Sequence, residues 1–205
     1  MRAPPALRAV LSRCALAVLL SLAAGCLTVD GTLRADGTGT LSLSYIAPPG
    51  ATEASQRGLL TAPGITIQSL TLGADRKFSA VLGVDDVAAI GKTPLFRAVT
   101  VTKTAQGDDQ VLTIKVIGQP KPVKDKSLAG PKIGITLPGK VVEANEGATV
   151  DGAHVAWSFT LADWLARASW ELTARYHPAA AGAEKAGGSA APAPSGAPKP
   201  AADTK

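Results

Sequence analysis

The feature that most constrains the fold of this chain is an alternation of apolar and polar residues along residues 27–178. Successive side chains of a β-strand point to opposite faces, so a period of two predicts strands with one buried face. Sheets of that kind are mostly antiparallel, because parallel strands are buried on both faces and read as continuous apolar runs. The pattern is clearest in residues 27–34, 40–45, 78–82, 99–102, 112–116, 133–137, 155–161 and 170–176.

Two short helices are predicted between these strands. One covers about Thr52–Leu60, with Thr52 as its N-cap. The other covers about Asp86–Ile90, with Asp85 as its N-cap and Gly91 as its C-terminal stop. The expected fold class is therefore α+β: a mostly antiparallel sheet of about nine strands with two short helices, followed by a disordered C-terminal tail.

The composition excludes several classes of protein. A chain of 205 residues suits one ordinary domain. Two His and two Cys are too few for most zinc sites or a disulfide scaffold. The sequence contains no GxSxG nucleophile elbow and no GxxxxGK[ST] or GxGxxG phosphate loop. We therefore expect no enzymatic activity, no catalytic residue, no bound metal and no cofactor.

The first 26 residues have the pattern of a secretory signal. Residues 1–13 are basic, and residues 14–22 are an apolar run that is too short to span a bilayer. The following AAGC ends at Cys26 and resembles the bacterial lipobox, in which the Cys thiol receives a diacylglyceryl group and the new amine an acyl chain such as palmitate. Ala23 stands where Leu is usual. The alternative is an ordinary signal that leaves Cys26 free.

The net charge changes when the signal is set aside. Three of the 21 basic residues lie in residues 1–25, which leaves 18 basic and 16 acidic residues and a net charge of +2. No basic stripe suited to a nucleic-acid backbone remains, so no nucleic-acid partner is expected. Acylation of Cys26 would anchor the chain on the extracytoplasmic side of a bacterial membrane, with inner and outer membrane both open.

The expected organisation has three parts. Residues 1–25 are the lipoprotein signal peptide, and residues 26–178 form the α+β domain. Residues 179–205 are rich in Ala, Pro and Gly and lack aromatic residues, so they cannot bury enough apolar surface to fold. This tail is interpreted either as a spacer through the envelope or as a segment without a function of its own.

Two fragments resemble the LppM-like domain of bacterial envelope lipoproteins. They are LTVDGTLRADGTGTLSLSY directly after Cys26, and LPGKVVEANEGATVDGAHVAWSFTL, which flank a βαββαβ-like middle. In the second fragment the matching residues are Pro138, Gly139, Val141, Val142, Asn145, Gly152 and Trp157. The resemblance implies a lipid-anchored surface protein that binds a lipid or glycolipid and is not an enzyme. Members of the family often end in a transmembrane helix and a basic tail, which this chain replaces with its Ala/Pro tail.

Few residues are candidates for a site. Trp164 lies between two predicted strands, where it could line a ligand mouth, touch a membrane or cap the sheet, whereas Trp157 and Trp170 are in phase with the core. His154 and His177 fall on polar strand positions, so exposed side chains are expected rather than metal ligands.

Two groups of charged residues are also interpreted as structural. The adjacent carboxylates at 85–86 and 108–109 sit at predicted caps or turns rather than at a catalytic or calcium site. The Lys-bearing segment 119–130 is expected to be a solvated loop, although its lysines could attract anionic lipid headgroups.

Two functions follow from these observations. The first is a lipid-anchored envelope lipoprotein that binds an apolar or amphiphilic ligand, such as a lipid or glycolipid, with Trp164 as the candidate contact and Cys26 as the lipidation site. The second is a structural lipoprotein that docks another envelope protein and holds no small molecule.

Overall fold

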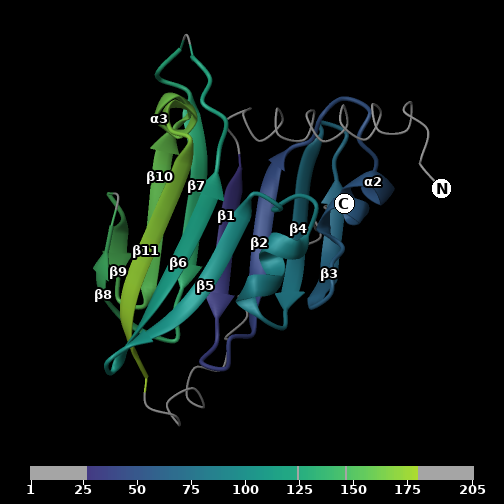
Figure 1. Cartoon of the computed structure of the whole chain (residues 1–205). Helices are drawn as coiled ribbons and strands as arrows, with labels where there is room; N and C mark the ends of the chain where they lie inside the picture. Colours follow the sequence, from purple (N-terminus) through teal and green to yellow (C-terminus); the bar gives the residue numbers. More distant parts are fainter. Residues whose placement is uncertain (1–26, 124, 146, 180–205) are drawn as a thin grey trace, which may run out of the picture.

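The computed structural model describes residues 27–123, 125–145 and 147–179, and strands dominate these residues (Figure 1). The strands are β1 (Thr28–Leu33), β2 (Gly39–Ile46), β3 (Ile65–Leu72), β4 (Lys77–Val84), β5 (Val99–Gln106), β6 (Asp109–Ile117), β7 (Ala129–Thr136), β8 (Gly139–Ala144), β9 (Thr149–Asp151), β10 (His154–Thr160) and β11 (Ser169–Pro178). The helices are α2 (Glu53–Leu60), the 3-10 helix η1 (Val87–Lys92) and α3 (Leu161–Ala166). The predicted signal peptide, Cys26 and residues 180–205 of the tail lie outside the described residues.

The expectation of a single sheet of about nine strands is wrong. Within the described residues eleven strands form two sheets, one of seven strands in the order β3-β4-β2-β1-β7-β10-β9 and one of four in the order β5-β6-β11-β8. The expectation of mostly antiparallel pairing holds, with one exception. β1 and β7 pair in parallel, so the chain leaves β1, builds β2 to β6, and returns to the neighbouring position.

The alternation of apolar and polar residues does not predict β3, because a bulge interrupts the pattern. Ile65 and Ile67 face the core in one phase, and Leu70 and Leu72 face it in the other. The register of β3 on β4 shifts between Ile67 and Ser69, which turns both apolar pairs toward the same face. β8 and β9 are short and largely exposed, so their residues carry a weak pattern.

The four-stranded sheet, helix α2 and the residues after η1 cover one face of the seven-stranded sheet. The four-stranded sheet packs over β1, β7 and β10, and this part of the core centres on Trp157, Leu172 and Tyr176. Helix α2 and the residues after η1 pack over β2, β3 and β4, around Leu60 and Phe78. The opposite face carries polar residues of β1 and β2 and is solvated. The inward-facing residues of the seven-stranded sheet therefore contribute to two neighbouring hydrophobic clusters.

Helix α2 forms as expected. Thr52 is its N-cap, and Thr52 and Ser55 form a reciprocal capping box. Its buried Gln56 accepts a hydrogen bond from the Tyr45 hydroxyl of β2, which joins the helix to the sheet. Burial raises the pKa of Tyr45 to about 12, because the phenolate would lose its hydration.

The second predicted helix differs from the expectation. It is the 3-10 helix η1, and its N-cap is Asp86 rather than Asp85. Gly91 lies inside the helix instead of stopping it. A Cβ at Gly91 would collide with the Val99 carbonyl oxygen, so glycine lets η1 approach β5 closely. The third helix, α3, was not predicted, and it lies across the end of the sandwich where β10 passes into β11 (Figure 1).

Candidate ligand-binding cavity

An open cavity of about 390 Å³ lies between the two sheets. Its volume falls within the range of small-molecule sites, ~300–1,000 Å³. Most of the residues around it are aliphatic or aromatic and come from β1, β5, β6, β7, η1 and α3. The surface is therefore suited to hydrocarbon rather than to a polar metabolite.

The cavity exists because inward-facing side chains do not fill the space between the sheets. Val29, Ile133, Val99 and Val116 occupy inward positions of β1, β7, β5 and β6, yet each remains only half-buried. The inward position at Gly31 is different, because a Cβ there would lie 3.1 Å from the Ile135 side chain, so its neighbours already fill that space. The medium-sized aliphatic residues at the other positions leave room that larger residues would occupy.

The floor of the cavity is closed by the core. Leu33, Ile135, Leu112 and Ile114 line it and are buried. They belong to the same cluster as Trp157 and Tyr176, which fill the space between β10, β11 and β8. The cavity therefore ends against packed side chains and does not run through the domain.

The opening is marked by the lining residues that remain exposed. These are Pro94, Arg97, Ile117 and Gln119, and the Ile117 side chain is 68% exposed. All four lie in the connection from η1 to β5 or just where β6 ends. The β6 end is also the end of the sandwich that α3 crosses, because the Gly118 N–H donates to the Ala168 carbonyl.

Trp164 lies in the lining near this opening, on α3 rather than on an irregular connection. Its ring stacks on Trp170 at 5.4 Å between centroids and 9° between planes, and Phe159 lies 5.2 Å from it. The Trp170 indole N–H donates to the Trp164 carbonyl at 3.0 Å, and the Arg167 guanidinium lies 4.3 Å from the Trp170 ring. These contacts hold the Trp164 ring in place as one wall.

Leu27 also lines the cavity and precedes β1. Its carbonyl accepts a hydrogen bond from the Lys132 N–H of β7, so it is fixed at the start of the parallel pair. β1 and β7 both begin at the end of the sandwich that carries α3 (Figure 1). The first described residue and the opening are therefore at the same end.

The ionisable residues in the lining are two cations. Arg97 and Lys121 contribute to it, and among the described residues no Asp, Glu or His does. The Lys121 backbone N–H donates to the Leu165 carbonyl, which fastens residue 121 to α3. Within the described residues neither side chain is paired with a carboxylate.

The two histidines lie away from the cavity. His154 is half-buried, with Nδ1 3.2 Å from the Thr136 hydroxyl, and its ring lies over Gly134, so the expectation of an exposed side chain is wrong there. His177 is exposed and contacts Asp109 at 3.1 Å. Among the described residues, no group of three or more His, Cys, Asp or Glu is placed to hold a metal ion.

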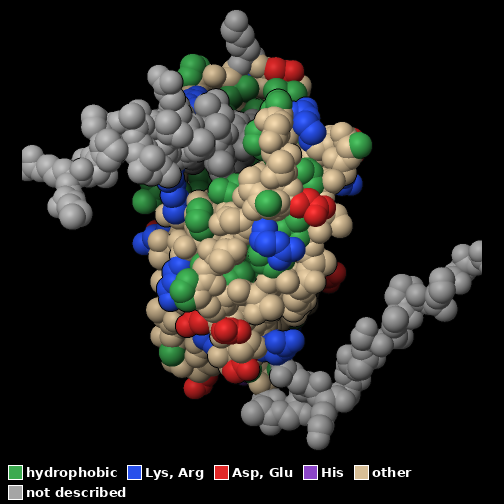
Figure 2. Space-filling model, turned by 90° about the vertical axis from the view of Figure 1, so that its right-hand side faces the viewer, with side chains coloured by type: hydrophobic (Ala, Val, Ile, Leu, Met, Phe, Trp, Pro, Cys, Tyr) green, Lys and Arg blue, Asp and Glu red, His purple; other side chains and the backbone are tan. Residues whose placement is uncertain are grey.

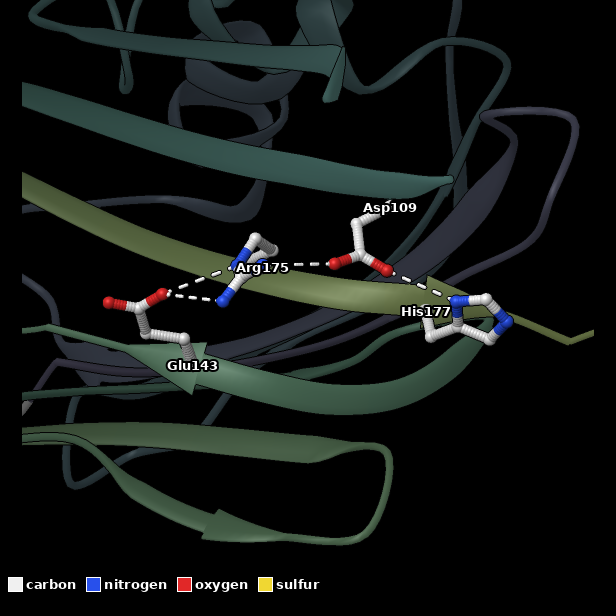
Figure 3. A network of polar contacts seen from close by, with 4 residues as sticks. All are labelled: Asp109, Glu143, Arg175 and His177. Carbon is white, nitrogen blue, oxygen red and sulfur yellow. Dashed lines mark hydrogen bonds and ion pairs between the residues drawn. The ribbon is translucent and has the colours of Figure 1, made fainter. Parts of the chain in front are cut away.

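Asp109 belongs to a polar network on the outer face of the four-stranded sheet (Figure 3). Arg175 of β11 contacts Asp109 of β6 at 3.1 Å and Glu143 of β8 at 2.9 Å. His177 completes the row, so the four side chains join three neighbouring strands. Exposed ion pairs of this kind add little to stability. We therefore interpret the network as a link between three strands rather than as a binding site.

The Lys-bearing segment and the surface are mixed in character. Residues 122 and 125–129 are exposed, as expected, whereas Lys121 is half-buried against the cavity and residue 124 lies outside the described residues. On the face shown in Figure 2, hydrophobic side chains lie in small groups among polar surface, and basic and acidic groups alternate. In the described part of the chain no helix is long and apolar enough to cross a membrane.

The sequence pattern indicates Trp164 as a lining residue and does not indicate the others. The sequence pattern around Val29, Ile133 and Val116 is that of ordinary core positions in a strand. It does not distinguish a side chain that lines a cavity from one that is fully packed. Arg97 and Lys121 stand in irregular segments. The available signal was the scarcity of large residues: the chain has three Phe, three Trp and two Tyr to fill the space between two sheets.

The comparisons with known proteins add no family to this description. No protein-family model matches the chain, and a search of curated proteins gives no match.

Proposed function

We propose that this chain is a non-catalytic envelope lipoprotein that holds an apolar or amphiphilic ligand, such as a lipid or glycolipid, in the cavity between its sheets. The observation that carries the proposal is the open, aliphatic cavity of about 390 Å³ beside a fully packed core. Apolar walls of this kind favour an apolar ligand, because its binding removes their surface from water.

The anchor supports the same function. Cys26, the proposed lipidation site, is one bond from Leu27, which lines the cavity. Acyl chains on Cys26 would hold the α3 end of the sandwich at the membrane. The exposed Ile117 and Leu128 lie at this end, where they would meet lipid. A ligand could then pass between bilayer and cavity without crossing water.

Membership of the LppM-like family is part of this proposal. A docking lipoprotein without a ligand is the second candidate. It would be favoured by a chain that stays empty under all conditions.

The test of ligand binding is native mass spectrometry on residues 27–205, purified without detergent from a bacterial cytoplasm. This chain retains every described residue. We expect a reproducible adduct of lipid mass. Val29→Trp should abolish the adduct because the indole would occupy the cavity, whereas Thr28→Trp, one residue away on the solvated face, should keep it. A polypeptide that carries no adduct and binds no lipid from an envelope extract would contradict the proposal.

Lipidation is tested separately, with the full chain in a bacterial host. Metabolic labelling with an alkyne-bearing palmitate should tag the wild-type chain and leave Cys26→Ser unlabelled. Retention of the wild-type chain in the membrane fraction and release of the variant should accompany this. Equal labelling of the wild-type chain and Cys26→Ser would mean that the acyl group is not on Cys26, and it would contradict the proposed anchor.

A further inference from the structure

The charges of the cavity rim point to the chemistry of the ligand's head group. Rim refers here to the lining residues of the η1–β5 connection and of residues 117–121. It contains Arg97 and Lys121, and the lining contains no carboxylate. Cations in the wall of an apolar site create a positive potential that low-dielectric surroundings screen poorly.

The two cations are available to a ligand. Arg97 is exposed and Lys121 is half-buried, and neither is paired with a carboxylate in the described residues. Two basic side chains on the outer face of the four-stranded sheet are paired with carboxylates. Lys115 contacts Glu171 at 3.1 Å, and Arg175 contacts both Asp109 and Glu143. The two rim cations differ from this pair in having no carboxylate partner among the described residues.

Backbone hydrogen bonds fix the segments that carry the two rim cations near the opening of the cavity. Arg97 precedes Ala98, whose carbonyl accepts from the Ile117 N–H, and Lys121 is held by its backbone bond to Leu165 of α3. Both side chains thus project from segments tied to the end of β6 and to α3. Arg97 and Lys121 line the same cavity as the aliphatic walls, so a chain held between the sheets would have its head group within the cations' part of the lining.

We propose that the cavity selects amphiphiles with an anionic head group, with the hydrocarbon between the sheets and the head group held by Arg97 and Lys121. The inference rests on the proposed function and deepens it. Arg suits a phosphate or carboxylate because its planar donors can bind two oxygens at once, and Lys adds a point charge.

The test measures displacement of a neutral fluorescent probe, N-phenyl-1-naphthylamine, from residues 27–205. The competitors share one alkyl chain: dodecyl phosphate, dodecanoate, dodecanol and dodecyltrimethylammonium. The charged competitors are used below their micelle concentrations and dodecanol is used below its solubility limit. We expect the two anions to bind at least about tenfold more tightly than dodecanol, and the cation to bind most weakly. Inorganic phosphate alone should displace no probe, because without a tail it does not enter the cavity.

The variants separate the head-group site from the cavity. Arg97→Gln with Lys121→Gln should weaken dodecyl phosphate and dodecanoate about tenfold and leave the probe and dodecanol unchanged. Lys92→Gln with Lys140→Gln removes the same charge from residues outside the lining and should change none of them. Added salt should reduce the preference for the anions in the wild type and not in the rim variant.

The outcomes are distinct. Equal affinity of the wild type for dodecyl phosphate and dodecyltrimethylammonium, or an unchanged anion preference in the rim variant, would overturn this inference and leave the proposed function standing. Failure of the wild type to bind the probe and every amphiphile would overturn the proposed function, and the head-group inference with it.

Discussion

The two sides of the sandwich are built from the same alternating strands and have opposite interiors. On the packed side, between β10, β11 and β8, the inward positions hold Trp157, Tyr176, Val155 and Leu172, each at most 1% exposed. On the cavity side, between β1, β7, β5 and β6, the inward positions hold Val29, Ile133, Val99 and Val116, which are half-buried around open space. Side-chain size, and not the polarity pattern, separates a core from a site.

The largest effect is expected from opening the packed side. Trp157→Ala should destabilise the domain by ~3–5 kcal/mol, because it removes a buried indole together with its hydrogen bond to the Asn145 carbonyl. Trp164→Ala, on the cavity side, should cost less than half of that, since its ring already borders open space, and it should weaken ligand uptake. Equilibrium denaturation with a chemical denaturant measures both. Equal losses would show that the two sides do not differ in packing.

Filling each side provides the converse comparison. Ala174→Leu inserts methyl groups into the packed side and should destabilise by ~1–3 kcal/mol through overpacking. Ile133→Phe inserts a larger side chain into open space, so its stability should change by less than ~1 kcal/mol while probe binding is lost. Thermal denaturation and probe fluorescence measure the pair. A large loss of stability in Ile133→Phe would mean that the cavity is not available to a larger side chain.

The two tyrosines report on the packed regions, because neither lines the cavity. Burial raises the pKa of Tyr45 to about 12 and raises that of Tyr176. A raised pKa in the folded state means that stability is fully present below pH ~10, where tyrosine ionises in the unfolded chain, and falls as the pH rises toward 12. Each group contributes a slope of at most about 1.4 kcal/mol per pH unit.

The measurement is the free energy of unfolding between pH 9 and 12. Tyr45→Phe should reduce the slope, and it also leaves Gln56 without its buried partner at a cost of ~1–3 kcal/mol. Binding of dodecanol, which carries no charge, should leave the slope unchanged. A slope that changes when dodecanol is bound would place a tyrosine in contact with the site.

The smallest effect is expected on the outer face of the packed side. Asp109→Asn interrupts the row formed with Arg175 and His177 and should cost less than about 1 kcal/mol, because the partners are exposed and screened by solvent (Figure 3). Denaturation in low and high salt measures it. A loss above about 2 kcal/mol would show that this network, rather than the core beneath it, stabilises the four-stranded sheet.

Local patterns were sufficient for the elements whose signals are local. The alternation of 40–45 and 155–161 predicts strands because the period is visible within one segment, and the Thr52 cap predicts the start of α2 because a capping bond spans three residues. β3 was missed because a bulge divides its pattern, and η1 was misassigned because Gly91 serves its contact with β5 rather than a helix end.

The sequence by itself determined that residues 27–178 form one-sided strands with a solvated face, since each residue's polarity sets which face can be buried. It also indicated Trp164, which lies between two predicted strands, as a candidate ligand contact. Only the tertiary structure decided that β1 pairs with β7, that the strands divide between two sheets, and that a cavity with a basic rim lies between them. The physical reason is that space between sheets depends on the summed volumes of side chains that are distant in the chain, and no local pattern records that sum.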